Sequence, residues 1–216
     1  MIDIKARERS LFNDWRMNMA PVIKGAFVED GVVDEQRFLQ EPCRLVFVLK
    51  EANQMGKTSL TEFLYNGAPG NGGHTWNPVC RWLTGEKARV FSPEERKDIL
   101  RRIAVMNLKK EDGCSVTDMR ELENAVKRDK DFIKLQMEIY VQHAPVVFIC
   151  CGPGLLTMIR EHVYANAHIE REAPLPFMKP YAGREVYFIA FNHPNARKAN
   201  LVAKFGLIQT LIKGDY

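Results

Sequence analysis

Three side chains that can carry chemistry stand at or near the ends of short apolar runs. Glu51 and His193 each lie two positions beyond such a run, and Asn107 lies near the end of another. A carboxylate can stabilise positive charge and orient water, and an imidazole can stabilise negative charge that develops on an oxygen. A side-chain amide offers both a donor and an acceptor. Together these groups could assist the cleavage of a bond in which charge separates.

Four apolar runs, separated by helical segments, must position these groups. They cover residues 45–49, 103–108, 145–151 and 186–191. Continuous apolar runs of this length are typical of strands that are buried on both faces. We therefore predict an α/β protein, a three-layer α/β/α sandwich with a short four-stranded, mainly parallel central sheet. Ligands of such sheets bind outside the carboxyl ends of the strands, where Glu51, Asn107 and His193 would meet.

The chain before the first apolar run has its own helical pattern. Residues 4–19 place four large apolar side chains on one face, namely Leu11, Phe12, Trp15 and Met19. Such a face is typical of an amphipathic helix that packs against a core. We expect residues 1–43 to form an N-terminal helical extension packed on the core. Residues 44–216 are expected to form the α/β/α domain.

Two further helices and two tryptophans complete the expected architecture. Ser92–Glu95 has the residues of a capping box with proline at the first helical position, and predicts a helix that begins there. A second helix is expected over residues 118–143, with a break near Asp129. We expect Trp15 and Trp82 to lie in the core.

Composition is that of an ordinary globular protein. The chain has 216 residues, of which 46% are apolar and 27% charged, with a net charge of +4. This composition excludes disorder and fibrous repeats, and no apolar run approaches the length of a membrane span. The chain starts without the apolar stretch of a signal peptide. The five cysteines include no Cys-x-x-Cys pair, so we expect reduced thiols, a cytoplasmic location and no bound metal.

One motif points to a different class of protein. Residues Glu51 to Thr58 match the phosphate-binding loop G-x4-G-K-[ST], except that glutamate replaces the first glycine. That glycine lets the backbone cradle the phosphates, and Glu51 would add negative charge at this place. None of the other apolar runs ends in an aspartate that could hold magnesium. A degenerate nucleotide-binding protein is therefore the least favoured alternative.

The order of the strand-end motifs resembles the uracil-DNA glycosylase superfamily over residues 44–212. Val48–Gln54 resembles the first motif of that family, which carries an acid as in GEAPG, and Phe191–Arg197 resembles its HPSPL or HPSPR motif. Between them, Val105–Lys109 resembles the strand with an asparagine that binds the base. Phe148–Gly154 resembles the third strand with its glycine turn.

The resemblance implies a DNA repair enzyme that hydrolyses the N-glycosidic bond of a flipped, uracil-like base. It implies that Glu51 and His193 are catalytic, with Glu51 beside the sugar and His193 at the departing base. Phe63 is the first candidate for stacking on the base, with Tyr65 and Trp76 as rivals. The expected base-binding residues are Asn107, Phe63, Asn53 and Gly152. The expected DNA-binding residues are Arg197, Lys109, Lys110 and Lys198, which would form a basic rim together with Lys50 and Lys57.

Departures from the family pattern leave a second hypothesis open. Lys50 replaces the glycine before the acid, Asn53 stands at a usual proline, and Gln54 replaces a further glycine. A catalytically silent nucleic-acid-binding module on the same fold is therefore the alternative. The cysteine pattern of the members that hold an iron–sulfur cluster is missing, so no cofactor is expected. The expected partner is DNA, either a single strand or a damaged duplex, bound by a monomer.

Overall fold

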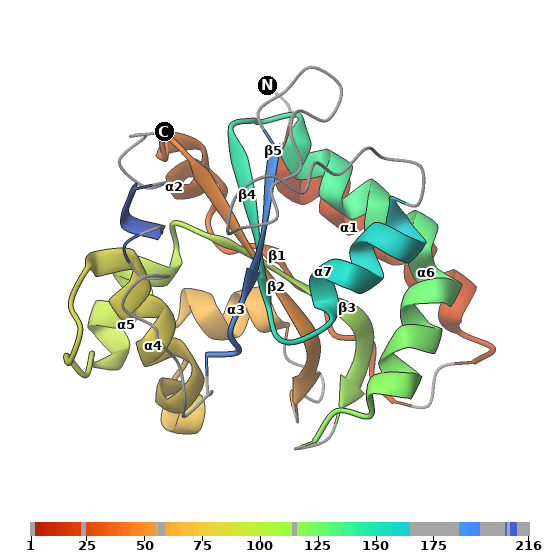
Figure 1. The fold of residues 1–216 in the computed structure, drawn as a ribbon, viewed down its shortest axis with the longest axis horizontal. Helices are drawn as coiled ribbons and strands as arrows, with labels where there is room; N and C mark the ends of the chain where they lie inside the picture. Colours follow the sequence, from red (N-terminus) through yellow and green to blue (C-terminus); the bar gives the residue numbers. More distant parts are fainter. Residues whose placement is uncertain are drawn as a thin grey trace.

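A mixed five-stranded sheet forms the centre of the part of the chain that the structure describes (Figure 1). This computed structural model describes residues 3–22, 25–53, 55, 59–113, 116–164, 186–194, 206 and 208–210. The strands lie in the order β1-β3-β2-β4-β5. Their bounds are Gly31–Val32 for β1, Arg44–Asn53 for β2, Ala104–Gly113 for β3, Val146–Cys151 for β4 and Val186–Phe191 for β5.

The expected four-stranded, mainly parallel sheet is wrong in two respects. The four predicted strands are present and pair in parallel, β3 with β2, β2 with β4, and β4 with β5. A fifth strand, β1, pairs with β3 in antiparallel orientation, which makes the sheet mixed. Because β1 has only two residues, Gly31 and Val32, no periodic apolar pattern marks it in the sequence.

Helices cover both faces of this sheet (Figure 1). On one face α1, α6, α7 and the π-helical turn η2 pack against the side chains of Val46, Val48, Met106 and Phe148. On the other face α3, α4 and α5 pack against Phe47, Leu49, Val105 and Ile149. The helices are α1 (Ile4–Met19), α2 (Glu35–Gln40), α3 (Leu60–Tyr65), η1 (Gly70–Gly72), α4 (Gly73–Thr84), α5 (Pro93–Leu100), α6 (Met119–Val141), α7 (Leu155–Met158) and η2 (Ile159–Val163).

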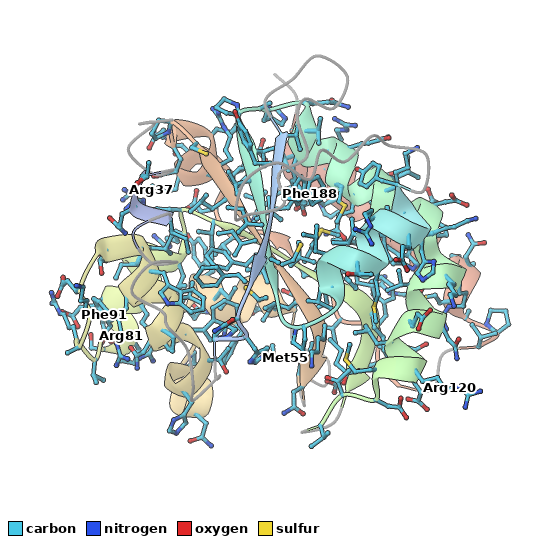
Figure 2. All side chains as sticks on the ribbon, viewed as in Figure 1. Arg37, Met55, Arg81, Phe91, Arg120 and Phe188 are labelled. Carbon is cyan, nitrogen blue, oxygen red and sulfur yellow. The ribbon has the colours of Figure 1, made fainter. Side chains whose placement is uncertain are left out.

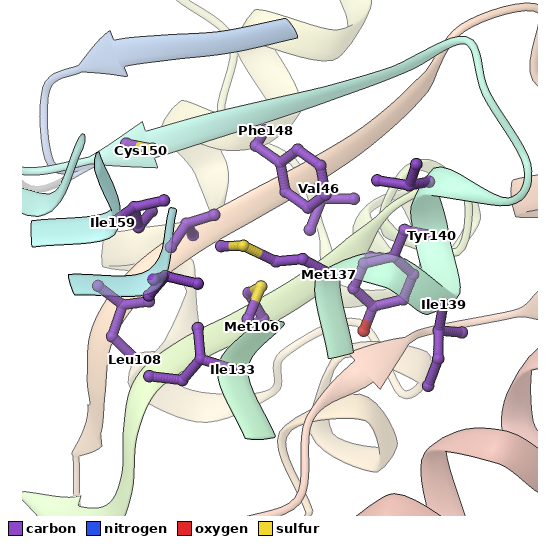
Figure 3. Packing of buried hydrophobic residues seen from close by; sticks show 14 of the residues in the cluster. Val46, Met106, Leu108, Ile133, Met137, Ile139, Tyr140, Phe148, Cys150 and Ile159 are labelled. Atoms are coloured by element: carbon purple, nitrogen blue, oxygen red, sulfur yellow. The ribbon is translucent and has the colours of Figure 1, made fainter. Parts of the chain in front are cut away.

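Side chains fill the space between the sheet and each helical layer (Figures 2 and 3). Trp15 and Trp82 are buried, one on each face, as the sequence predicts. In the layer that Figure 3 draws, Met106 on β3, Met137 on α6 and Phe148 on β4 belong to one buried cluster. Apolar burial of this kind contributes about 25 cal/mol for each Å² removed from water.

The residues before β2 share the core of the rest of the chain. The apolar face of α1 packs with α6 and the sheet, as expected, and β1 extends the same sheet. The expected break of the long helix is wrong, because α6 runs without interruption from Met119 to Val141. Asp129 lies within this helix, and its carboxylate accepts two hydrogen bonds from Arg128, at 2.9 and 2.7 Å.

Within the described part of the chain, no helix is long and apolar enough to cross a membrane. The capping box predicted at the start of α5 is confirmed. Ser92 Oγ accepts a hydrogen bond from the Glu95 N–H, and the Glu95 carboxylate accepts one from the Ser92 N–H. Four cysteines are buried, namely Cys43, Cys80, Cys150 and Cys151. Burial raises the pKa of the Cys80 thiol to about 12.

A fully buried ion pair lies between β3, α1 and α6. Lys110 Nζ is 2.7 Å from both carboxylate oxygens of Asp30, and neither side chain is exposed. The same carboxylate accepts hydrogen bonds from the Asn107 N–H at 2.6 Å and from Gln136 Nε2 at 2.8 Å. The rings of Phe12 and Trp15 cover the ammonium at about 5 Å. Burial lowers the pKa of Lys110, and the charge of Asp30 opposes this effect.

Glu8 extends this buried network toward α1. Its Oε1 accepts hydrogen bonds from Tyr140 Oη at 2.8 Å and from the Val32 N–H at 2.9 Å. Burial raises the pKa of Glu8 from 4.5 to about 8, although both hydrogen bonds oppose the rise. The folded protein therefore holds a proton on Glu8 that the unfolded chain releases above about pH 4.5.

The ionisation of Glu8 predicts that stability falls as the pH rises. Since the folded-state pKa is the higher one, the stabilisation is complete below about pH 4.5 and is lost as the pH approaches 8. In the Glu8→Gln variant this loss disappears, because the amide cannot ionise. As the pH rises, the unfolding free energy of the variant relative to that of the wild type should therefore increase by up to about 1.4 kcal/mol per pH unit. Urea unfolding between about pH 5 and pH 8 measures this difference.

Glu94→Gln is the matched control, since Glu94 is exposed on the first turn of α5. Its stability should follow the wild-type pH profile. Parallel profiles for Glu8→Gln and wild type would show that Glu8 is already ionised in the folded protein.

Candidate active site at the carboxyl edge of the sheet

Parallel pairing brings the ends of four strands to one edge of the sheet. Val48 pairs with both Met106 and Cys150, and Cys150 pairs with Ala190, so these four residues cross the sheet in one row. Three positions farther along their strands stand Lys109, Glu51 and His193. Glu51 lies on β2 and His193 follows β5; since neighbouring strands lie about 4.8 Å apart and β4 lies between these two, their backbones are about 10 Å apart. An acid and an imidazole therefore flank the end of β4, where Gly152 lies.

Lys109 holds the carboxylate of Glu51 in place. Lys109 Nζ is 2.8 Å from Glu51 Oε2, and the two side chains are 12% and 4% exposed. Burial works against the charge of Lys109, but its hydrogen bond and charge interaction with Glu51 outweigh burial and raise its pKa. Gly113 makes room for this arrangement, because a Cβ there would lie 2.4 Å from Glu51 Cδ. Glu51 is thus oriented and its charge balanced by its neighbour on β3.

The side chain of Lys50 lies over the end of β4, and its charge acts on His193. Gly152 has φ +149°, and a Cβ there would lie 3.2 Å from Lys50 Cε, so the lysine side chain crosses the sheet edge over the glycine. Gly152 is fixed in turn by a hydrogen bond from its N–H to the Phe191 carbonyl at 2.9 Å. Burial lowers the pKa of His193, and the positive charge of Lys50 lowers it further. The imidazole is therefore mostly neutral at pH 7.

Asn107 lies one position beyond the row of paired residues, fully buried within the sheet. Its neighbours on the same face of β3 are Val105, which packs against the α3–α5 layer, and Lys109. Neither its Oδ1 nor its Nδ2 has a hydrogen-bond partner among the described residues. An unpaired buried amide costs about 1–3 kcal/mol. Asn107 thus presents a free donor and a free acceptor below the carboxylate of Glu51.

The other residues that the sequence predicts to bind or stack on the base have different surroundings from Asn107. Asn53 ends β2, pairs with Gly113 and is exposed. Phe63 lies on α3 and is half-buried, and its ring meets Gly72, where a Cβ would lie 2.6 Å from Phe63 Cζ. Its two rivals are occupied elsewhere. The guanidinium of Arg101 lies 3.8 Å from the ring centre of Tyr65, and Trp76 is buried in the core.

The expected basic rim of phosphate-binding lysines is wrong for Lys110. This side chain is 0% exposed, since it points into the core toward Asp30, and its ammonium cannot reach a phosphate. Lys109 also points inward, to Glu51. Arg197, Lys198 and Lys57, the remaining expected contacts, lie outside the described residues.

The degenerate phosphate-loop motif does not begin as a loop. Glu51, Ala52 and Asn53 continue β2, and Asn53 still pairs with β3. Between the pairs Glu51–Lys109 and Asn53–Gly113, β2 advances two residues and β3 advances four, which bends β3 locally. A phosphate loop would leave the strand at this point, so the first half of the motif lacks the required backbone. Most of its second half lies outside the described residues.

No cluster of three or more histidine, cysteine or acidic side chains that could hold a metal ion occurs in the part of the chain that the structure describes. Sequence reasoning missed two members of the site, Lys50 as the cation near His193 and Gly113 as the space beside Glu51. The glycine at position 152 is a sequence signal that could have indicated Lys50, because a glycine at a strand end allows a neighbouring side chain to cross it.

The charge effect of Lys50 on His193 predicts a pKa change in a single variant. Lys50→Met removes the positive charge, so the pKa of His193 should rise toward its ordinary value, while burial keeps it below that value. NMR titration of the imidazole measures this pKa, with the resonance assigned from its absence in His193→Gln. Lys130→Met, on the exposed side of α6, should leave the titration unchanged. An unchanged or lowered pKa in Lys50→Met would show that the charge of Lys50 does not act on His193.

Comparison with known proteins identifies no family for this chain. The chain matches no protein-family model, and a search of curated proteins finds no significant similarity. The function must therefore be argued from the residues at this edge.

Proposed function

We propose that the protein is a uracil-DNA-glycosylase-like enzyme that removes a flipped, uracil-like base from DNA. The fold would be the three-layer α/β/α sandwich of that superfamily, with β1 as an additional edge strand. The observation that carries the proposal is the buried amide of Asn107, which has no partner among the described residues and lies on the sheet beside the Glu51–Lys109 pair. A pyrimidine edge offers a carbonyl acceptor and an N–H donor, which are the two partners that this amide lacks.

Glu51 and His193 would act on the two sides of the bond that breaks. Cleavage of an N-glycosidic bond builds positive charge on the sugar and negative charge on the base. The Glu51 carboxylate would stabilise the sugar cation and orient water, as carboxylates do in glycoside hydrolysis. The His193 imidazole would donate a hydrogen bond to a base oxygen. Because the pKa of His193 is lowered, its neutral form is favoured, and the imidazole can bind the base without first releasing a proton.

Lys50 and Lys109 would tune the charges of this site. Lys109 balances the Glu51 carboxylate in the free protein and is the nearest cation to it on β3. The positive charge of Lys50, beside His193, would favour negative charge on a departing base. This gives the departure from the family pattern at position 50 a physical role. The same position that the family gives to glycine would here carry a cation for the leaving group.

Activity on oligonucleotides tests the proposal directly. Wild-type protein should produce abasic sites, detected by alkaline strand cleavage, in an oligonucleotide that contains uracil or another damaged pyrimidine. His193→Gln and Glu51→Gln should each lower the single-turnover rate by roughly a hundredfold to a thousandfold. His162→Gln, a matched change at a histidine on η2, should leave the rate within about twofold of the wild type.

DNA binding without cleavage of any damaged base would favour the alternative, a catalytically silent nucleic-acid-binding module. Cleavage that survives both His193→Gln and Glu51→Gln would place the chemistry elsewhere in the protein.

Asn107→Leu separates a base-binding role from a structural role. Leucine has nearly the shape of asparagine and no polar atoms, so it removes two unpaired buried groups. The variant should be more stable than the wild type by about 1 kcal/mol or more, and yet should lose base cleavage. Urea unfolding and single-turnover cleavage measure the two effects. If asparagine were only structural, Asn107→Leu would destabilise the protein. Asn124→Leu, at an exposed position of α6, is the control for the change in hydrophobicity.

A further inference from the structure

A cavity of about 430 Å³ lies beside α4 and α5, apart from the edge that holds Glu51. His74, Asn77 and Arg81 line it from one face of α4, Arg96 lines it from α5, and Gly70 lines it from η1. Among the described residues that line the cavity, none carries a carboxylate. Figure 2 places Arg81 and Phe91 at the outer side of the α4–α5 layer, well separated from Met55 at the end of β2.

Arg96 brings a buried positive charge to this cavity. Its side chain donates hydrogen bonds to the carbonyls of Gly67 at 2.9 Å, Phe91 at 2.5 Å and Ala68 at 3.0 Å, and the residue is 4% exposed. Within the described residues no carboxylate lies within 4 Å of its guanidinium. The other buried cation, Lys110, has Asp30 as its counterion. A buried charge without a counterion is unfavourable, so the position of Arg96 favours an anion in the cavity.

Asn77 adds an unused donor at the same place. The residue is 9% exposed, and its Oδ1 accepts a hydrogen bond from the Phe91 N–H at 2.9 Å. This bond turns its Nδ2 toward α5, and Nδ2 donates to no described residue. A Cβ on Gly73 would lie 3.2 Å from Asn77 Nδ2 and 3.3 Å from Arg96 Nη1. Both nitrogens therefore approach one point beside the start of α4.

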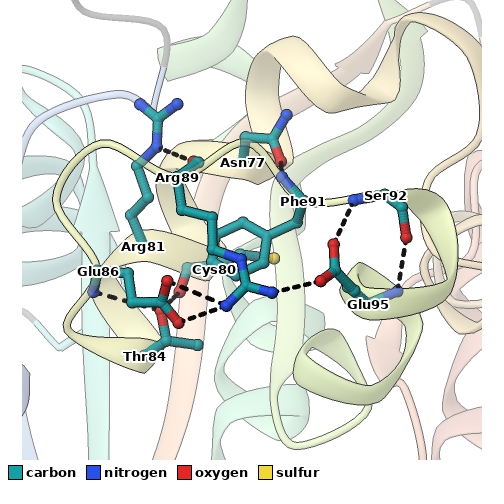
Figure 4. A network of polar contacts seen from close by, with 9 residues as sticks. All are labelled: Asn77, Cys80, Arg81, Thr84, Glu86, Arg89, Phe91, Ser92 and Glu95. Atoms are coloured by element: carbon teal, nitrogen blue, oxygen red, sulfur yellow. Dashed lines mark hydrogen bonds and ion pairs between the residues drawn. The ribbon is translucent and has the colours of Figure 1, made fainter.

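Arg81 completes the set of donors. Its Nε donates to the Arg89 carbonyl at 2.6 Å, and its terminal nitrogens have no partner among the described residues. The nearby acids do not neutralise it, because Glu86 and Glu95 are both paired with Arg89. Figure 4 shows the guanidinium of Arg81 and the amide nitrogen of Asn77 directed to the same side, away from these ion pairs.

We propose that this cavity binds a phosphate group. Two guanidinium groups and an amide donor face a space that no described residue lines with a carboxylate, and arginine matches phosphate with parallel hydrogen bonds. The volume lies in the range of small-molecule sites and admits a nucleotide as well as a free phosphate. The phosphate belongs either to a nucleic-acid strand or to a free nucleotide. The proposal does not depend on the glycosylase activity, since it rests on other residues and on binding alone.

Calorimetric titration at low salt with three probes tests the proposal: inorganic phosphate, thymidine monophosphate and a short single-stranded oligothymidylate. Asn77→Asp keeps the acceptor for the Phe91 N–H and replaces the donor by a negative oxygen, so it should raise the dissociation constant at least tenfold. Arg81→Gln should weaken binding in the same direction. Arg89→Gln is the matched control, because Arg89 is paired with Glu86 and Glu95, and it should leave the dissociation constant within about twofold.

The probes distinguish the two sources of the phosphate. Tighter binding of the oligothymidylate, with a steep loss of affinity as salt rises, would assign the cavity to a nucleic-acid backbone. Equal or tighter binding of thymidine monophosphate would assign it to a free nucleotide. The proposal is overturned if no probe binds, or if Asn77→Asp binds all three probes as the wild type does while its thermal unfolding is unchanged.

Discussion

The buried ion pair between Lys110 and Asp30 fixes the strand on which the candidate site depends. Asp30 stands just before β1, and its carboxylate binds the ammonium of Lys110, the N–H of Asn107 and the amide of Gln136. The pair thus joins the edge of the sheet to α6 at the point where β3 becomes irregular. Removing one partner of such a pair typically costs 3–5 kcal/mol, because the other charge stays buried. The positions of Asn107 and Lys109 therefore follow from an interaction on the opposite face of β3.

Each of the two candidate catalytic side chains interacts with a lysine, and the two lysines act in different ways. Lys109 binds the Glu51 carboxylate directly, so it orients the acid and balances its charge. Burial lowers the pKa of His193, and Lys50, which lies over Gly152, lowers it further through its charge. The site therefore has a negative charge at one end, on Glu51, and a positive charge at the other end, near His193. A reaction that develops positive charge at one end and negative charge at the other suits this arrangement.

The sequence predicts the parts of this fold that depend on local pattern. The four long apolar runs, the helix of α1 and the capping box of α5 are all present, because each is specified by neighbouring residues. The two adjacent lysines of β3 could not be distinguished in this way. Both faces of β3 are apolar from Ala104 to Met106, so no alternation indicates which lysine points to Glu51 and which to Asp30. The answer depends on Asp30, a residue 80 positions away.

At the two candidate sites, three polar groups are not fully paired within the described part of the chain. The amide of Asn107 is buried without a described partner, Arg96 is buried without a described counterion, and Asn77 leaves a donor unused. Each lowers stability, whereas the equally buried Lys110 has Asp30, Asn107 and two aromatic rings around it. Other buried polar atoms, such as Trp15 Nε1 and Gln136 Oε1, also lack a described partner, so a missing partner favours a ligand only where further polar side chains lie beside it. The amide of Asn107 is suited to a base edge and the cavity at Arg96 to a phosphate, which are two parts of one kind of molecule, a nucleotide.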